Sequence, residues 1–159
     1  MQRGYARTIA AWQYPVEYAF YDWANDPADL AELLDAMSWL DRYHAAISED
    51  GSIIGFLQTI LEGNSIEIGL GLRPDLTGIG HGRDFLNACL HFAAERFAVH
   101  RFTLAVATFN RRAIAVYERS GFRATGKFTQ HTNGGEYPFV RMERLHHAED
   151  NTPCWLQDR

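Results

Sequence analysis

The order of elements between residues 43 and 107 constrains the fold of this chain most strongly. Three segments with alternating apolar side chains read as consecutive antiparallel strands separated by turn residues: Tyr43–Ser48, Ile53–Leu61 and Ser65–Leu72. A glycine-rich loop, Arg73–Gly82, then leads into an amphipathic helix, and a further strand follows at Phe102–Ala107. A strand, a helix and a strand in this order predict a right-handed parallel crossover. The sequence therefore predicts an α/β fold with a mixed central sheet and flanking helices.

Helix signals come before this unit. The spacing of apolar residues near the start predicts a short helix that ends before Pro15. Asp26 followed by Pro27 is typical of a helix start, because aspartate caps the free amides and proline fits the first helical position. The apolar face expected of this second helix comprises Leu30, Leu33, Leu34 and Met37.

The last third of the chain predicts another helix and a hairpin. Asn110–Ser120 has a helical pattern that is closed by Gly121. Two strands, Phe122–Thr129 and Tyr137–Glu143, flank the turn residues Asn133–Gly135. After residue 145 the sequence becomes polar. We therefore expect one domain over residues 1–145 and a polar tail over residues 146–159.

Composition narrows the class of protein. A length of 159 residues suits a single domain, and 47% hydrophobic residues suit a packed core. A net charge of -5 argues against a nucleic-acid partner, because the phosphate backbone would repel it. No apolar run approaches 18 residues, so no membrane span is expected. Cys89 and Cys154 lie far apart and suggest reduced thiols, which predicts a cytoplasmic location.

The loop before the long helix has the chemistry of a phosphate site. Gly78, Gly80 and Gly82 precede the helix start, where free N–H groups and the helix dipole favour an anion. Alternating glycines let the backbone approach a phosphate closely and permit a positive φ. A plain tight turn is the alternative for any such loop. The segment lacks the Gly-Lys-Ser/Thr of a nucleotide P-loop and the third glycine of the dinucleotide pattern.

Two sequence blocks together resemble the GCN5-related N-acetyltransferases, the GNAT family. The first is the loop Pro74–Gly82, which is similar to the family's pyrophosphate motif (Arg/Gln)-x-x-Gly-x-(Gly/Ala), although Thr77 stands where the family has Arg or Gln. The second, Asn110–Phe122, is similar to the family's Asn-x-x-Ala-x-x-x-Tyr-x-x-x-Gly-Phe. The family normally begins with a strand before its first helix, and this chain begins with a helical pattern instead.

This resemblance implies a cosubstrate and a place for it. In the family, acetyl-CoA lies where the fourth and fifth strands splay apart, which here correspond to Ser65–Leu72 and Phe102–Ala107. Gly69 and Gly71 would leave room there for a thin chain, or would mark a β-bulge. The residues that the resemblance implies for cofactor binding are Leu70, Gly71, Leu72, Thr77, Gly78, Ile79, Gly80, His81, Gly82, Arg83 and Asn110. Asn110 is equally well explained as a helix N-cap.

The resemblance also implies two catalytic residues. Tyr117 matches the tyrosine that protonates the departing CoA thiolate, and its alternative is a packing role on an amphipathic helix. Glu67 stands where several family members keep a general base, and its alternative is a solvent-facing strand carboxylate. A backbone N–H near Leu70 would stabilise the oxyanion. Direct attack by a primary amine on the thioester is the implied reaction.

Several questions stay open at this level. The seven histidines show no metal-ligand spacing, so no metal is expected. A noncatalytic acyl-CoA-binding domain and an unrelated nucleotide-binding module are the alternatives to an enzyme. The acceptor is a small-molecule or peptide amine. Aromatic residues in the segments expected to form its walls, together with Glu17, Asp22 and Glu136, suit a cationic or an aromatic amine. Neither its identity nor a homodimer follows from the sequence.

Overall fold

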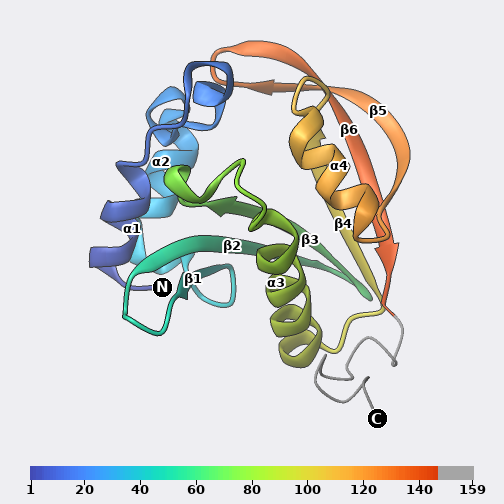
Figure 1. Cartoon of the computed structure of the whole chain (residues 1–159), viewed down its shortest axis with the longest axis horizontal. Helices are drawn as coiled ribbons and strands as arrows, with labels where there is room; N and C mark the ends of the chain where they lie inside the picture. The colour runs from blue at the N-terminus through green and yellow to red at the C-terminus, as the bar shows by residue number, and fades with distance from the viewer. Residues whose placement is uncertain (147–159) are drawn as a thin grey trace.

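The computed structural model describes residues 1–146 and contains one six-stranded sheet in the order β1-β2-β3-β4-β6-β5 (Figure 1). The strands are β1 Tyr43–Ile47, β2 Ile53–Glu62, β3 Ser65–Leu72, β4 Arg101–Ala107, β5 Arg123–Thr132 and β6 Gly135–Leu145. The α-helices are α1 Arg3–Ala10, α2 Pro27–Leu34, α3 Gly82–Phe97 and α4 Arg111–Arg119. Short 3₁₀ turns are η1 Val16–Tyr21, η2 Trp23–Asn25, η3 Ala36–Ser38 and η4 Pro74–Leu76. The predicted α/β class is confirmed, and no strand precedes α1 within these residues.

The sheet consists of two antiparallel halves joined by a short parallel contact. Strands β1, β2 and β3 pair antiparallel with one another, as do β4, β6 and β5. β3 and β4 are parallel, as the crossover predicts, but they pair only from Ser65–Glu67 to Arg101–Thr103. Beyond this contact the two strands diverge, so the sheet opens toward the carboxyl ends of β3 and β4 (Figure 1).

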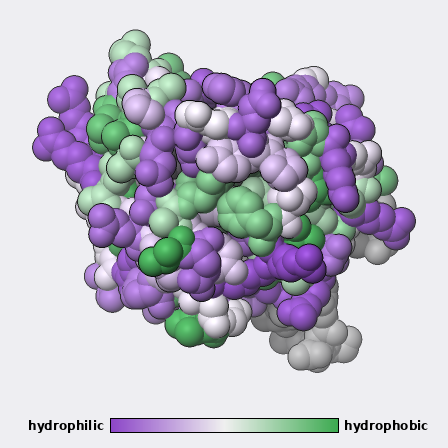
Figure 2. All heavy atoms as spheres, turned by 90° about the horizontal axis from the view of Figure 1, so that it is seen from above, coloured by the Kyte–Doolittle hydropathy of each residue, from purple (hydrophilic) through white to green (hydrophobic). Residues whose placement is uncertain are grey.

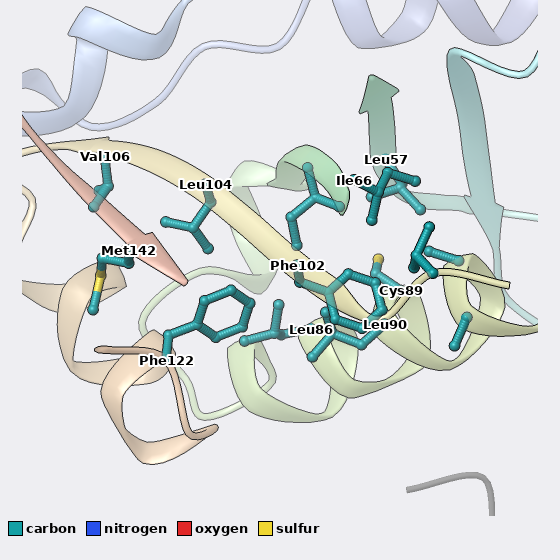
Figure 3. Close-up of a cluster of buried hydrophobic side chains, with 14 of the residues drawn as sticks. Leu57, Ile66, Leu86, Cys89, Leu90, Phe102, Leu104, Val106, Phe122 and Met142 are labelled. Carbon is teal, nitrogen blue, oxygen red and sulfur yellow. The ribbon is translucent and has the colours of Figure 1, made fainter. Parts of the chain in front are cut away.

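The larger hydrophobic core lies between the sheet and the helices α3 and α4. Figure 3 shows side chains from the strands pointing toward those of the helices across this layer. Ile66, Leu86 and Phe102 are almost fully inaccessible to solvent. The amphipathic helix predicted after the glycine loop is confirmed: Phe85, Leu86, Cys89, Leu90 and Ala93 are buried, and Phe97 is partly buried against them. This packing fixes the loop that precedes α3 against the sheet.

A smaller core covers the opposite face. Ala6, Ile9, Trp12, Leu33 and Tyr43 form this cluster, and the ring of Phe56 packs against it. The aromatic side chains buried in this smaller core hold α1 and α2 on the half of the sheet made by β1, β2 and β3. The 3₁₀ turns that follow α1 therefore lie beside the opening between β3 and β4.

Two sequence predictions are corrected by the structure. The second helix ends at Leu34, so Leu34 and Met37 are not on a buried face; they are 44% and 78% exposed. Asp35 accepts the Met37 amide and starts a separate 3₁₀ turn, which ends the helical pattern there. The turn of the second hairpin is Asn133–Gly134, both with positive φ, and Gly135 already belongs to β6.

The predicted tail lies outside the described residues from 147 onward. Its first residue, His146, still contacts the domain: its amide donates to the carbonyl of His100, and its ring packs on Phe102. Within residues 1–146, no helix has the length and apolar character to cross a bilayer.

Candidate active site

A cleft of about 770 Å³ occupies the opening between β3 and β4. Its walls come from β3, the loop before α3, one face of α4 and the segment from Tyr14 to Trp23. Aromatic rings crowd the last of these walls, where the ring of Phe20 packs edge-on against Tyr21, Phe109 and Tyr137. Seen from above, this end of the molecule has apolar residues in the middle of the face and hydrophilic residues around them (Figure 2).

One edge of β3 presents unpaired backbone to the cleft. The amide of Arg73 donates to the Ile54 carbonyl, and the register with β2 runs unbroken from there. Because hydrogen-bonded and non-hydrogen-bonded pairs alternate in an antiparallel ladder, the backbone groups of Leu70 and Leu72 point away from β2. They face the gap where β4 no longer pairs. The Tyr14 hydroxyl donates to the Leu72 carbonyl over 3.0 Å.

Gly71 makes room for a side chain of β2 and does not mark a β-bulge. A β-carbon at residue 71 would lie 2.3 Å from Cε1 of Phe56, so the absence of a side chain makes space for that ring. The continuous register excludes the β-bulge considered for Gly69 and Gly71. A β-carbon at residue 69 would lie 3.0 Å from Oε1 of Gln58, a flexible side chain. Both glycines line the cleft, and Phe56 fills much of the space at Gly71.

The glycine loop has the geometry of an anion-binding turn. Gly78 and Gly80 have φ of 76° and 98°, a region that favours glycine. Gly82 begins α3, and a β-carbon there would meet Val116 of α4 at 3.5 Å. Within the described chain no side chain caps α3, whereas Asp26 caps α2 and Asn110 caps α4. The first amides of α3 are therefore available to a ligand.

The cleft brings together most of the predicted site residues but not all of them. Those that line it are Leu70, Gly71, Leu72, Thr77, Gly78, Gly80, Gly82, Arg83, Asn110 and Tyr117. Ile79 is 62% exposed and does not line it, and His81 lines a separate groove between α3 and β1. Glu67 lies in the paired part of β3, opposite Ile60 and Thr103, and is also absent from the lining. Gly69, two residues further along the same face, does line it.

Tyr117 lies on the cleft face of α4 with its ring against Phe122. Its hydroxyl has no hydrogen-bond partner among residues 1–146, so the proton is free for a ligand. Burial raises the pKa of Tyr117 well above 10, and the Tyr21 hydroxyl and the Cys89 thiol raise it further. The phenol therefore stays protonated at neutral pH.

Asn110 and Tyr21 meet Tyr117 at the end of β4. Asn110 Oδ1 accepts the Ala113 amide over 3.1 Å, so the N-cap explanation is confirmed, while the residue also lines the cleft. The hydroxyl of Tyr21 is shielded from solvent and makes no hydrogen bond of ordinary geometry. Burial raises the pKa of Tyr21, against smaller lowering effects of the Asn110 side chain and the Ala107 backbone amide. The sequence showed Tyr21 only as one of several aromatic residues.

Charge is divided between the two sides of the cleft. Arg83, Arg112 and Arg119 reach it from α3 and α4, whereas Asp22, Asp26 and Asp29 reach it from the segment before and within α2. Of the three acidic residues expected in the acceptor walls, Asp22 lines the cleft, whereas Glu17 and Glu136 do not; Asp26, Asp29 and the two arginines on α4 were not predicted. Such an arrangement suits an anionic ligand on one side and a cationic ligand on the other. Among residues 1–146, no three histidine, cysteine or acidic side chains gather as metal ligands do.

Comparisons with known proteins agree with this geometry. The acetyltransferase (GNAT) family model matches residues 6–122, so this chain belongs to the GNAT family of acetyl-CoA-dependent N-acetyltransferases. The predicted family, fold and enzyme class are confirmed. A comparison with curated protein sequences finds no match.

Solved structures share the fold over nearly the whole chain. Spermidine N-acetyltransferase from Vibrio cholerae, in complex with CoA and spermine, has a TM-score of 0.72 and 24% identity, covering 91% of this chain and 92% of that one. A chimera of the Vibrio cholerae enzyme and hSSAT has a TM-score of 0.74 and 23% identity, with the same coverage. A GNAT-family acetyltransferase from Bacillus anthracis has a TM-score of 0.57 and 18% identity, covering 65% and 66%. At these identities the similarity establishes the fold.

Proposed function

We propose that this chain transfers an acetyl group from acetyl-CoA to a primary amine by direct attack. The observation that carries the proposal is the cleft between β3 and β4, because it gathers three features in one space. These are the glycine loop at the start of α3, the edge of β3 at Leu70 and Leu72 that pairs with no other strand, and the Tyr117 hydroxyl. Each would serve a different part of acetyl-CoA.

The proposed cofactor path runs along β3. The pyrophosphate would accept hydrogen bonds from the amides of the glycine loop, with Gly78, Gly80 and Gly82 allowing close approach and Arg83 adding charge. Thr77, Ile79 and His81 would contribute through the backbone of the same loop. The pantetheine amides would pair with the backbone of Leu70 and Leu72, on the edge of β3 that β4 leaves uncovered. Asn110 would contact the arm near the end of β4.

The chemistry would proceed in one displacement. A neutral amine attacks the thioester carbonyl, a carbon–nitrogen bond forms and the carbon–sulfur bond breaks. The Leu70 N–H would stabilise the negative charge on the carbonyl oxygen. Tyr117 would give its proton, or a strong hydrogen bond, to the departing thiolate. The amine proton would leave through a water molecule to Glu67, since that carboxylate lies outside the cleft lining.

We further propose that the acceptor is a small cationic amine of the polyamine type. Asp22, Asp26 and Asp29 place carboxylates on the acceptor side of the cleft, and the aromatic residue Phe20 also lines it. Aromatic faces and carboxylates together recognise ammonium groups. Spermidine N-acetyltransferases have the same fold, which is compatible with this choice.

A thermal-shift experiment tests the cofactor assignment. Acetyl-CoA should raise the Tm of the wild-type protein, because a ligand that binds only the native state stabilises it. Gly80→Asp places a carboxylate where the phosphate would lie, and a β-carbon there meets no other atom within 4 Å, although φ is unfavourable. A folded Gly80→Asp variant should show no shift with acetyl-CoA. An equal shift in both proteins, or none in wild type, would contradict the phosphate-loop assignment.

Thiol release across amine classes tests turnover. CoA should be released faster when the acceptor is spermidine or another polyamine than when it is a peptide or an amine with no second positive charge. A protein that binds acetyl-CoA and acetylates none of these amines would instead fit a noncatalytic acyl-CoA-binding domain.

A further inference from the structure

The glycine loop lacks a side-chain partner of its own for a phosphate. Thr77 stands at the position where the family motif has Arg or Gln. Its hydroxyl donates to the Pro74 carbonyl over 2.7 Å, so its single proton is used within the loop. His81 lines a different groove. The cations that line the cleft near this loop therefore come from the helices, Arg83 from α3 and Arg112 from α4.

Arg112, the second residue of α4, reaches this loop from the neighbouring helix. Its Nη1 lies 3.2 Å from the position that a β-carbon of Gly78 would occupy. The guanidinium of Arg112 therefore lies beside the glycine turn at Gly78. The cleft lining contains both Arg112 and Gly78.

The guanidinium of Arg112 has no carboxylate partner among residues 1–146. Other arginines of the chain do: Arg42 pairs with Glu32, Arg73 with Asp75 and Arg101 with Glu143. Arg112 instead lies over the ring of Tyr18, with Cζ 4.0 Å from the ring centroid. Stacking uses the face of the guanidinium and leaves the N–H groups on its edge for hydrogen bonds.

We propose that Arg112 binds the cofactor pyrophosphate and supplies, from α4, the side chain that position 77 lacks. The proposal rests on the proposed function, because it names a further residue of the same cofactor site. The flat, fork-shaped donor set of arginine suits two phosphate oxygens at once. Tyr18 belongs to η1, so its ring holds the guanidinium beside the loop before the cofactor arrives.

Calorimetric titration with CoA tests this role. Arg112→Ala should raise the Kd for CoA by about 10- to 100-fold. Arg112→Lys should retain only part of the wild-type affinity. Arg111→Ala is the matched control, because Arg111 is the adjacent arginine and does not line the cleft. Its Kd should stay within about twofold of wild type. Pantetheine, which has no phosphate, should bind wild type and Arg112→Ala equally.

The outcomes separate this inference from the proposed function. If wild type binds CoA and Arg112→Ala binds it as tightly, the role of Arg112 is wrong and the cofactor site stands. If Arg112→Ala also loses pantetheine affinity by the same factor, the residue only shapes the cleft and the proposal fails. If wild type does not bind CoA, the proposed function itself fails. Arg112→Gln, which keeps a polar side chain and loses the charge, replaces the alanine variant if circular dichroism shows misfolding.

Discussion

At the scale of single residues, Tyr117 combines a free hydroxyl with a raised pKa. Because burial raises its pKa, the phenol stays protonated at neutral pH and is able to donate. The same shift makes complete loss of the proton costly. We therefore expect Tyr117 to act mainly through a strong hydrogen bond that becomes a proton transfer as the thiolate leaves.

Tyr117→Phe should lower kcat by about 10- to 1,000-fold and leave the Kd for acetyl-CoA nearly unchanged. The hydroxyl has no partner among residues 1–146, so its removal costs no internal hydrogen bond, and the ring still packs on Phe122. Steady-state kinetics with acetyl-CoA and one amine check this. An unchanged kcat, with chemistry shown to limit the rate, would make Tyr117 a packing residue.

Glu67→Gln should lower kcat/KM for the amine by about 10- to 100-fold, less than a directly placed base contributes, because the proton travels through water. The measurement compares both proteins with the same amine across pH, since the amine titrates as well. Cofactor affinity should not change, because Glu67 does not line the cleft. Wild-type rates and an identical pH profile would show that solvent takes the proton.

The part of the site that the sequence predicts consists of residues that lie close together along the chain. The glycine loop and Tyr117 lie in short motifs, and a local turn or one helix face places them. Arg112 and Tyr21 were missed, because their roles depend on the distance from α4 to the segment after α1, about 90 residues away. The departure at Thr77 was the available signal that another cation is needed.

At the scale of elements, β3 is a strand with two different edges. Its pairing with β2 is complete, and its pairing with β4 stops after Glu67. The glycines on one face let β2 pack its large side chains without bending the strand. The open edge therefore stays straight and regular, as a ligand that pairs with it requires.

Gly71→Ala and Gly69→Ala should differ in stability although they are two residues apart. Alanine at 71 would overlap the Phe56 ring, which also packs on Trp12 and Trp23, so we expect a loss of about 1–3 kcal/mol. Alanine at 69 meets only the flexible end of Gln58, so its cost should be below about 1 kcal/mol. Urea unfolding of the two variants measures the difference.

A second variant identifies the cause. Combining Gly71→Ala with Phe56→Leu should cost less than the sum of the two single changes, because the smaller side chain removes the overlap. Additive losses would mean that the alanine strains the backbone instead. Equal stabilities of the two alanine variants would contradict the packing argument.

Element order and type followed from periodicity, and element ends did not. The hairpins and the crossover were predicted because alternation and turn residues are local signals. The end of α2 was wrong because Leu34 and Met37 continue the helical spacing, while Asp35 caps a new turn at that point. The sequence alone does not indicate whether another element will cover a leucine or methionine side chain.

At the scale of the whole molecule, the larger core contains a titratable group that the site does not use. Cys89 is 6% exposed, and burial raises the pKa of its thiol from 9.0 to about 12. The folded protein therefore holds this proton more tightly than the unfolded chain does. Stability from the thiol is complete below pH 9 and falls as pH rises toward 12.

Cys89→Ala should flatten the decline of stability between pH 9 and 10.5. Each proton that only the folded state retains lowers the unfolding free energy by about 1.4 kcal/mol per pH unit. Urea unfolding under reducing conditions, at several pH values from 7 to 10.5, compares the two proteins. Buried tyrosines add a further decline above pH 10 in both, so the comparison is the difference between the curves. Parallel curves over the whole range would show that the thiol does not titrate as expected.

The short contact between β3 and β4 has a mechanical consequence. Within the described chain, only three residue pairs join the two halves of the sheet, each a leaf of three strands, and we call this contact the seam. Beyond the seam no backbone hydrogen bonds connect β3 with β4, so the sheet is less stiff there. A ligand whose amides pair with Leu70 and Leu72 would occupy the place of the absent neighbouring strand on that edge. Filling the cleft would then bridge the leaves and damp their motion relative to each other, so that hydrogen exchange should slow along the seam as well as at the contacts themselves.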